Sequence, residues 1–373
     1  MIPTQSPPSP ATDPAPVQPR GRRSRATGRG RAGDKFFAAL ARGSTLLTLL
    51  ILGALVFVLA EAALPSVEEN GAKFLVSSEW RPNELEVQKR DPAGQLVIED
   101  GEIATEKIAP SFGALPVIYG TAMSSLLALL LAVPVAIGAA LFLVRVCRPR
   151  LGVPLSFLIE FLAAIPSIAY GMWGLMVLAP FLQDRVEPFL RSIFDLPGLH
   201  WLFHETISVG GETVARVLPL TGRDMFCGGL VLGIMILPIV TAISRDVLRA
   251  VPREQIEGSL ALGATWWQSS VAMLRYSRAG LLGAVLLGLA RAAGETMAVT
   301  MVIGNNNQIR ASIFAPAQTM SSLLANEFAE ATTELHRAAL IEVALVLLLM
   351  SLIFNVSARL LVTGNMAGKA ASA

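Results

Sequence analysis

Six apolar runs, each long enough to cross a bilayer, restrict this chain to membrane architectures. A helix needs about 20 mostly apolar residues to span a hydrocarbon core about 30 Å thick. Runs of that length lie at 36–64, 117–144, 153–181, 224–243, 279–303 and 338–362. Lipid cannot satisfy free backbone N–H and C=O groups, so such runs form helices. The sequence therefore predicts an all-α fold, a polytopic membrane bundle of six transmembrane helices.

Basic residues sort the connections between these runs onto two sides. Lys and Arg gather before the first run, in the turn 145–150 and in the loop 244–278, which places these segments in the cytoplasm. The segments 65–116 and 304–336 are richer in acids than in bases. This charge pattern predicts that both termini are cytoplasmic.

The expected domain organisation follows from the same segments. Residues 1–35 are rich in Pro, Ser, Gly and Arg, a composition typical of a disordered tail. Residues 36–64 are the expected first transmembrane helix, and 65–116 the expected external loop. The remaining five helices fall in 117–362, followed by a short cytoplasmic tail at 363–373.

Several classes of function lack the residues they need. No stretch reads GxxxxGK followed by Ser or Thr, so the chain carries no P-loop and is not expected to be an enzyme that hydrolyses ATP by that route. The basic N-terminal cluster is better explained as cytoplasmic retention than as a nucleic-acid site, because an apolar span follows at once. His200 and His204 stand beside Glu205 without a further strong ligand set, so no metal site is predicted.

An arginine and a glutamate, Arg291 and Glu295, interrupt the apolar run 279–303. Arg291 lies about 16 Å from the inner end of its run, near mid-membrane, where a charge is costly and indicates a functional site. On one continuous helix, both side chains share a face with small residues, which let helices approach closely. These small residues are Gly280, Ala284, Gly288 and Ala292. The alternative is a structural clamp that satisfies its own charges.

The loop 244–278 carries its own helical pattern. From Arg253 it reads REQIEGSLALGATWWQSS. Ile256 and Leu260 fall at helical spacing, acids occupy the first turn, and Gly263 marks a bend. The pattern predicts a short cytoplasmic helix between the fourth and fifth spans that presents an apolar ridge to a partner. A helix lying on the membrane surface is the alternative.

Within this loop, Glu257-Gly258-Ser259 followed three residues later by Gly263 resembles the EAA loop of ABC importer permeases. In that family the EAA loop couples the permease to ATPase subunits. Family members often have Ala at the two positions held here by Gly258 and Ser259. The resemblance implies the following coupling residues: Glu257, Gly258, Ala261 and Gly263.

Three further segments closely resemble the C-type permease subunits of phosphate-specific ABC importers. They are RAAGETMAVTMVIGN at 291–305, AAIPSIAYGMWGL at 163–175 and ANEFAEA at 325–331. The likeness implies a permease of a bacterial inner membrane that moves inorganic phosphate inward. It also implies that the chain holds no cofactor, with ATP and Mg bound by a partner. The implied partners are a homologous A-type permease, two copies of a cytoplasmic ATPase and an external phosphate-binding protein, with lipid and no nucleic acid.

The implied substrate pathway contains Arg291, Glu295 and Thr296. A guanidinium stays charged and offers a planar fork of donors to phosphate oxygens, while Glu295 is expected to hold Arg291 in place. Glu160, in the third run, is a possible charge partner of Arg291 or Arg145, with a structural salt bridge as its expected role. The alternatives are a permease for sulfate or phosphonate, an ion-coupled carrier without an ATPase, and a non-transporting scaffold or sensor.

Overall fold

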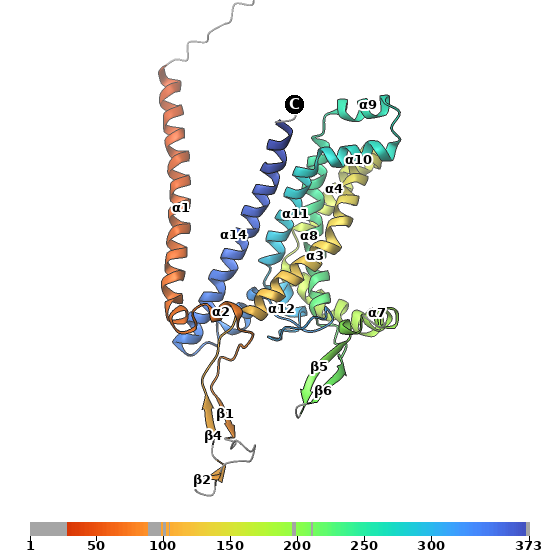
Figure 1. Cartoon of the computed structure of the whole chain (residues 1–373). Helices are drawn as coiled ribbons and strands as arrows, with labels where there is room; N and C mark the ends of the chain where they lie inside the picture. The colour runs from red at the N-terminus through yellow and green to blue at the C-terminus, as the bar shows by residue number, and fades with distance from the viewer. Residues whose placement is uncertain are drawn as a thin grey trace, which may run out of the picture. The chain divides into compact units, whose positions relative to one another are not determined.

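The computed structural model describes residues 28–88, 98–99, 102–103, 105–195, 199–209 and 212–370 (Figure 1). Contacts divide the chain into two compact units, Met1–Val56 and Phe57–Ala373. Each unit is described by itself. Helices dominate the described residues, with three small two-stranded sheets, as the sequence predicts.

The first unit holds the N-terminal part of α1, which runs over Gly28–Asn70. The predicted first span, 36–64, lies inside this helix, and its large apolar side chains are mostly exposed, as lipid contact requires. The helix begins at Gly28, earlier than predicted. Residues 28–35, which were predicted to belong to the disordered tail, are helical. The rest of the predicted tail, 1–27, lies outside the described residues.

The second unit contains every later element. Its helices are α2 (Lys73–Val76), α3 (Leu115–Leu141), α4 (Pro149–Ala163), α5 (Ser167–Trp173), α6 (Ala179–Phe181), α7 (Glu187–Phe194), α8 (Met225–Arg249), α9 (Arg253–Ala261), α10 (Trp266–Tyr276), α11 (Arg278–Ala293), α12 (Met297–Val302), α13 (Met320–Glu327) and α14 (Glu334–Ala370). Four short helical turns join them: η1 (Phe142–Val146), η2 (Gly174–Leu178), η3 (Leu182–Val186) and η4 (His200–Leu202). Helix α14 continues through residues 363–370, so the predicted cytoplasmic tail 363–373 is helical over its described part.

The strands form antiparallel pairs in the connections between helices. Strand β1 (Leu85–Gln88) pairs with β4 (Thr105–Ile108), β2 (Ile98–Glu99) with β3 (Glu102–Ile103), and β5 (His204–Val209) with β6 (Glu212–Val217). In Figure 1 the β5–β6 hairpin and α7 lie at one end of the second unit, the hairpin end. Helices α9 and α10 lie at the other, the α9 end.

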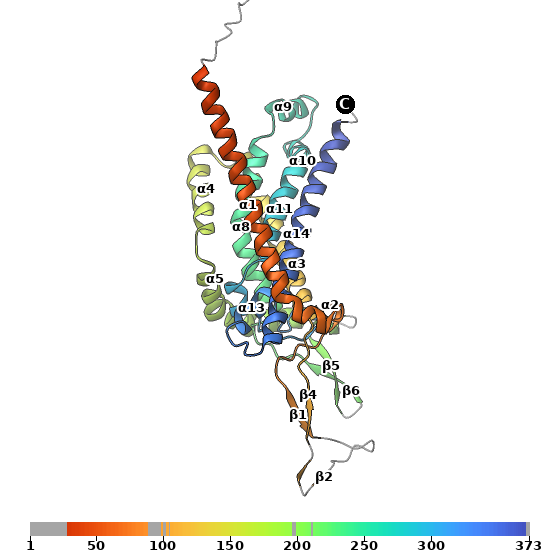
Figure 2. The same ribbon diagram turned by 90° about the vertical axis from the view of Figure 1, so that its left-hand side faces the viewer.

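The number of spans agrees with the prediction when bent helix pairs are counted as single spans. Four described helices are long and apolar enough to cross a membrane, and two bent pairs bring the number to six. One pair joins Arg150–Ala163 to Ser167–Phe194 at 86°, with Pro166 at the start of α5; Figure 2 shows α4 and α5 as separate segments. The other joins α10 to α11 at 67°.

The prediction of one continuous helix over 279–303 is wrong for the second half of that range. Helix α11 ends at Ala293, with Gly294 in the capping position, and α12 begins at Met297. Gly294 has a φ of −93°, within the ordinary range, and its N–H still donates to the Ala290 carbonyl. Glu295 and Thr296 therefore lie in a break rather than on a helical face.

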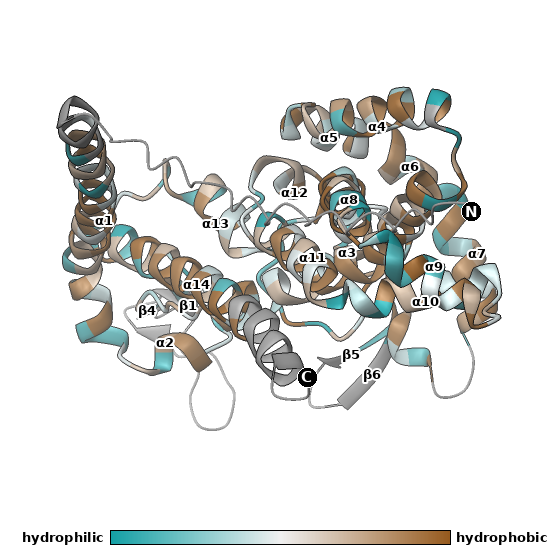
Figure 3. Cartoon of the chain, turned by 90° about the horizontal axis from the view of Figure 1, so that it is seen from above, coloured by the Kyte–Doolittle hydropathy of each residue, from teal (hydrophilic) through white to brown (hydrophobic). Residues whose placement is uncertain are grey.

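Small residues let α3, α8 and α11 pack closely in the centre of the bundle. A Cβ on Gly288 of α11 would come within 2.7 Å of Val240 Cγ2 on α8, and one on Gly229 within 2.6 Å of Leu127 on α3. Such spacing is typical of membrane helices, where association depends on close van der Waals contact. Seen from above, these helices are largely apolar (Figure 3).

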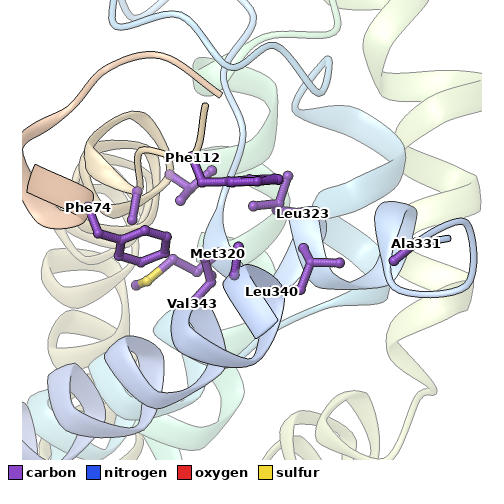
Figure 4. Close-up of a cluster of buried hydrophobic side chains, with 10 residues drawn as sticks. Phe74, Phe112, Met320, Leu323, Ala331, Leu340 and Val343 are labelled. Carbon is purple, nitrogen blue, oxygen red and sulfur yellow. The ribbon is translucent and has the colours of Figure 1, made fainter. Parts of the chain in front are cut away.

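Part of the predicted external loop 65–116 belongs to the packed core. Phe74 of α2 and Phe112 are buried with Met320 and Leu323 of α13 and Leu340 of α14 (Figure 4). The described residues around Phe74 and Phe112 therefore pack onto α13 and α14 rather than forming a free loop.

Gly222, just before α8, provides a direct test of the packing. Its φ is +64°, and an added Cβ would collide with the Ala179 carbonyl oxygen. We expect Gly222→Ala to lower the free energy of unfolding by roughly 2–4 kcal/mol, since it combines a left-handed residue with overpacking. Gly258→Ala is the control, because a Cβ there meets nothing within 4 Å. Equal thermal unfolding of the two variants in detergent would contradict this account.

Candidate functional site

The break between α11 and α12 is the best candidate for the functional site, because a charged pair sits there within a membrane helix. Arg291 lies about 20 Å along α11 from Arg278. Its Nη2 is 3.8 Å from Glu295 Oε2, and the two side chains are 45% and 8% exposed. The pair thus joins an accessible guanidinium to a buried carboxylate, in a loose contact that leaves donors of Arg291 available.

Contacts with α13 fix the break in position. Ser321 Oγ donates a 2.6 Å hydrogen bond to the Glu295 carbonyl oxygen. Met320 N in turn donates to Thr121 Oγ1 on α3 at 2.9 Å. Thr296 contributes its carbonyl oxygen, which accepts from Thr300 Oγ1 at 2.7 Å. The Glu295 carbonyl in the break therefore has a partner on α13, which its depth in the membrane requires.

The face on which Arg291 lies differs from the prediction. Ala284, Gly288 and Ala292 are buried against the bundle as predicted, but Arg291 is not among them. It lies instead with Leu287 and Gly294 on the exposed side of α11. Leu287, one helical turn before Arg291, is also exposed, so the described residues leave this strip of α11 uncovered, and the break at Gly294 redirects only Glu295 and the residues after it.

Glu160 has a different partner from either one predicted. Its Oε1 lies 2.9 Å from Arg245 Nη1 on α8, and Arg245 also donates to Asp246 Oδ1 at 2.8 and 3.0 Å. Arg245 is 8% exposed. This cluster ties α4 to α8 and so has the structural character expected of Glu160, but its partner is neither Arg291 nor Arg145. The pairing is non-local, and the sequence carries no signal for it.

The four predicted coupling residues lie on the exposed side of α9 and its following turn. Glu257, Gly258, Ala261 and Gly263 are all exposed. The predicted helix is present as α9, and Gly263 has a φ of +85°, which forms the predicted bend. Beyond it Thr265 and Gln268 form a capping box that starts α10.

A chain of contacts anchors α9 to the bundle. These contacts were not predicted from the sequence. Ile256 packs against the buried cluster around Leu248. On the same side, Ser259 Oγ donates to Ser269 Oγ at 3.0 Å, and Arg145 Nη2 reaches Ser269 Oγ at 3.3 Å. The Arg145 guanidinium also stacks on the Trp266 ring. In the sequence, Arg145 carried only a topological signal.

Two apolar side chains at the end of α9 remain uncovered. Leu260 and Leu262 are 45% and 91% exposed. At the same end of the second unit, Gln255 of α9 and residues of α10 line a hollow of about 650 Å³. An exposed apolar ridge is a shape suited to a protein partner.

Comparison with known proteins identifies the family. Residues 114–364 match the model of the binding-protein-dependent transport system inner membrane component. A phosphate transport system permease protein PstC of Mesorhizobium japonicum is 38% identical over 87% of this chain and 89% of its own length. The chain belongs to the PstC family of transport permeases.

Other PstC relatives agree over similar lengths. The Haemophilus influenzae protein is 36% identical over 85% of this chain and 89% of its own length. PstC 2 of Mycobacterium tuberculosis is 36% identical over 91% and 94%. Among solved structures, an inward facing conformation of the MetNI methionine ABC transporter aligns over 68% of this chain and 94% of its own, with 16% identity and a TM-score of 0.44.

At the hairpin end, this PstC-family chain has a cavity of about 700 Å³. Trp201, His204 and Glu205 line one side, and residues 308–312 line another. Arg310 Nη1 lies 3.2 Å from Glu205 Oε2, and the Arg310 carbonyl accepts from the Tyr119 hydroxyl at 3.1 Å. These contacts join the β5–β6 hairpin to the segment that follows α12.

Two buried carboxyl groups lie side by side at the same end of this PstC-family chain. Asp224 caps α8 by accepting from Cys227 N at 2.8 Å, and neither Asp224 nor Glu187 is exposed. Glu187 lies in the bent segment Ser167–Phe194, so this contact between carboxyl groups joins that segment to the start of α8.

Proposed function

We propose that this chain is the permease subunit of an ABC importer that moves inorganic phosphate into the cell, with energy supplied by separate ATPase subunits. The observation that carries the proposal is the half-exposed guanidinium of Arg291, held by a buried carboxylate within a membrane helix. The names of the PstC relatives support phosphate as the substrate. The family description supports dependence on a binding protein.

Arg291 supplies the anion site. A cation at membrane depth faces protein or water rather than lipid, so the exposed strip of Leu287, Arg291 and Gly294 borders the translocation pathway. A homologous A-type permease forms the opposite wall. The guanidinium keeps its charge and offers several donors to the phosphate oxygens, which offsets their desolvation.

Glu295 and Thr296 tune this site. The buried Glu295 carboxylate sits 3.8 Å from Arg291 Nη2, close enough to orient the guanidinium and to weaken its hold on a passing anion by partial neutralisation. Thr296 brings a hydroxyl to the same break. Phosphate is thus bound firmly enough to enter and weakly enough to leave.

The α9 end is the cytoplasmic, energy-coupling end in this proposal. It carries most of the arginines that the positive-inside rule places in the cytoplasm, and α9 presents Leu260 and Leu262 to an ATPase groove. Each of the two permeases contributes one such helix, so two ATPase copies bind, with ATP and Mg held by those subunits. The hairpin end then faces the external phosphate-binding protein.

Reconstitution of the purified complex tests the proposal. Vesicles with ATP supplied to the α9 side should accumulate labelled phosphate when the binding protein is outside, and should not do so without ATP. Excess sulfate or phosphonate should leave the uptake intact. Uptake that persists without the ATPase subunits would indicate an ion-coupled carrier, and competition by sulfate or phosphonate would assign a different oxyanion.

A further inference from the structure

Three metal-ligating side chains meet at the hairpin end, outside the pathway around Arg291. Asp195 follows the last turn of α7, His200 opens η4, and His204 begins β5. One ligand atom from each lies within 4.8 Å of the others. The three come from successive parts of the chain that already touch, since the His200 and His204 rings meet edge to face and His204 Nδ1 lies 3.2 Å from the His200 carbonyl oxygen.

The distances within this cluster suit a small divalent ion. Asp195 Oδ1 lies 2.9 Å from His200 Nδ1 and 3.6 Å from His204 Nδ1. Nitrogen and oxygen ligands at about 2.0–2.2 Å from a tetrahedral zinc ion stand about 3.3–3.6 Å apart. Small side-chain shifts would therefore allow all three atoms to bind one ion.

The surroundings leave room for a fourth ligand. His200, Asp195 and His204 have side chains that are 55%, 27% and 25% exposed, so water can reach the open position. Arg191 Nε contacts the other oxygen, Asp195 Oδ2, at 3.8 Å. Oδ1 thus remains directed at the two imidazoles.

We propose that Asp195, His200 and His204 bind a divalent cation of the Zn²⁺ class. Two imidazoles and one carboxylate with an open position form a ligand set that zinc accepts in proteins. From the sequence, only Glu205 stood beside the two histidines, and no metal site was predicted. In the structure Glu205 pairs with Arg310, and Asp195 supplies the third donor.

Bound metal would fix the start of β5 to the end of α7. His204 also lines the 700 Å³ cavity at the hairpin end, so the ion would set the position of one wall of that cavity. The metal acts as a structural clip in this inference, and neither the phosphate pathway nor the coupling helix takes part. The inference therefore stands independently of the proposed function.

Metal binding by the purified full-length chain tests the assignment. The protein is purified without a polyhistidine tag, stripped with a chelator, and titrated with Zn²⁺ against a chromogenic competitor. We expect one Zn²⁺ per chain in the unmodified protein. The double variant His200→Gln, His204→Gln should lose stoichiometric binding, and Asp195→Asn should weaken it by at least about tenfold, the loss that even an outer-shell change produces.

Glu205→Gln is the matched control, because Glu205 adjoins His204 in sequence but pairs with Arg310. It should keep the affinity of the unmodified protein. Co²⁺ provides a second readout, since a low-coordinate N/O site gives intense visible absorption that should vanish in the double variant. Absence of stoichiometric binding would overturn the proposal, as would binding unaffected in the double variant or a loss in Glu205→Gln as large as in Asp195→Asn. Size-exclusion elution confirms that each variant is folded.

Discussion

We expect Arg291→Gln to abolish ATP-driven phosphate uptake and to leave the transporter assembled. Glutamine keeps hydrogen-bonding capacity but removes the charge. A hydrogen bond to a charged group contributes about 1.5–3 kcal/mol, so occupancy of the pathway by phosphate should fall by roughly 10- to 150-fold for each bond lost. Since Arg291 is 45% exposed and its contact with Glu295 is loose, the fold should tolerate the change. Uptake by reconstituted vesicles and subunit co-purification measure the two expectations.

Two further variants control this result. Arg291→Lys keeps the charge without the planar fork and should retain partial uptake. Arg185→Gln removes another exposed arginine of the same chain and should transport normally. Normal uptake by Arg291→Gln would refute the role of Arg291, and loss of assembly would indicate a structural clamp instead.

The second large effect is expected at the turn after α9. Gly263 has a φ of +85°, whereas the proline ring fixes φ near −65°. Gly263→Pro should therefore turn α9 away from its position on α10 and reduce ATP-driven uptake to background, because the exposed ridge of Leu260 and Leu262 no longer meets the ATPase. ATP hydrolysis by the partner should lose its stimulation by the phosphate-loaded binding protein.

Gly263→Asn separates the backbone requirement from the identity of the residue. Asparagine adopts positive φ more readily than other side chains, and a Cβ at this position meets nothing within 4 Å, so uptake should be largely retained. Charge reversal at the exposed Glu257 should also uncouple ATP hydrolysis from transport if α9 is the docking element. Unchanged uptake and unchanged stimulation in both Gly263→Pro and the Glu257 variant would rule out docking there.

Local patterns in the sequence were enough to predict the number of spans and the α9 turn. Apolar length predicts the spans because the bilayer fixes how many residues are needed. The four-residue spacing of Ile256 and Leu260, followed by Gly263, predicts α9 because helical periodicity and helix termination are local signals. The bends at Pro166 and at Gly294 were within reach of the same signals, since proline and glycine are the usual sites of helix interruption.

Long-range partners could not be predicted in this way. Glu160 pairs with Arg245 across α4 and α8, and many other arginines would have served equally well from sequence alone. The contact of Arg145 with Ser269 and the meeting of Asp195 with His204 depend on folding that brings separate elements together. The exposure of Arg291 could not be predicted for a related reason, because the side of α11 that other helices cover depends on how the bundle packs.

The central claim, that Arg291 borders a water-filled route for an anion, is tested most directly by thiol accessibility. The chain has two cysteines, Cys147 and Cys227, and both are replaced before cysteine is introduced at position 291 in the assembled transporter. A charged, membrane-impermeant thiol reagent should label this position, and phosphate with the binding protein should slow the labelling. A cysteine at Leu349, 54% exposed on α14, should resist the reagent. Equal resistance at position 291 would place the side chain in lipid or sealed protein and contradict the account.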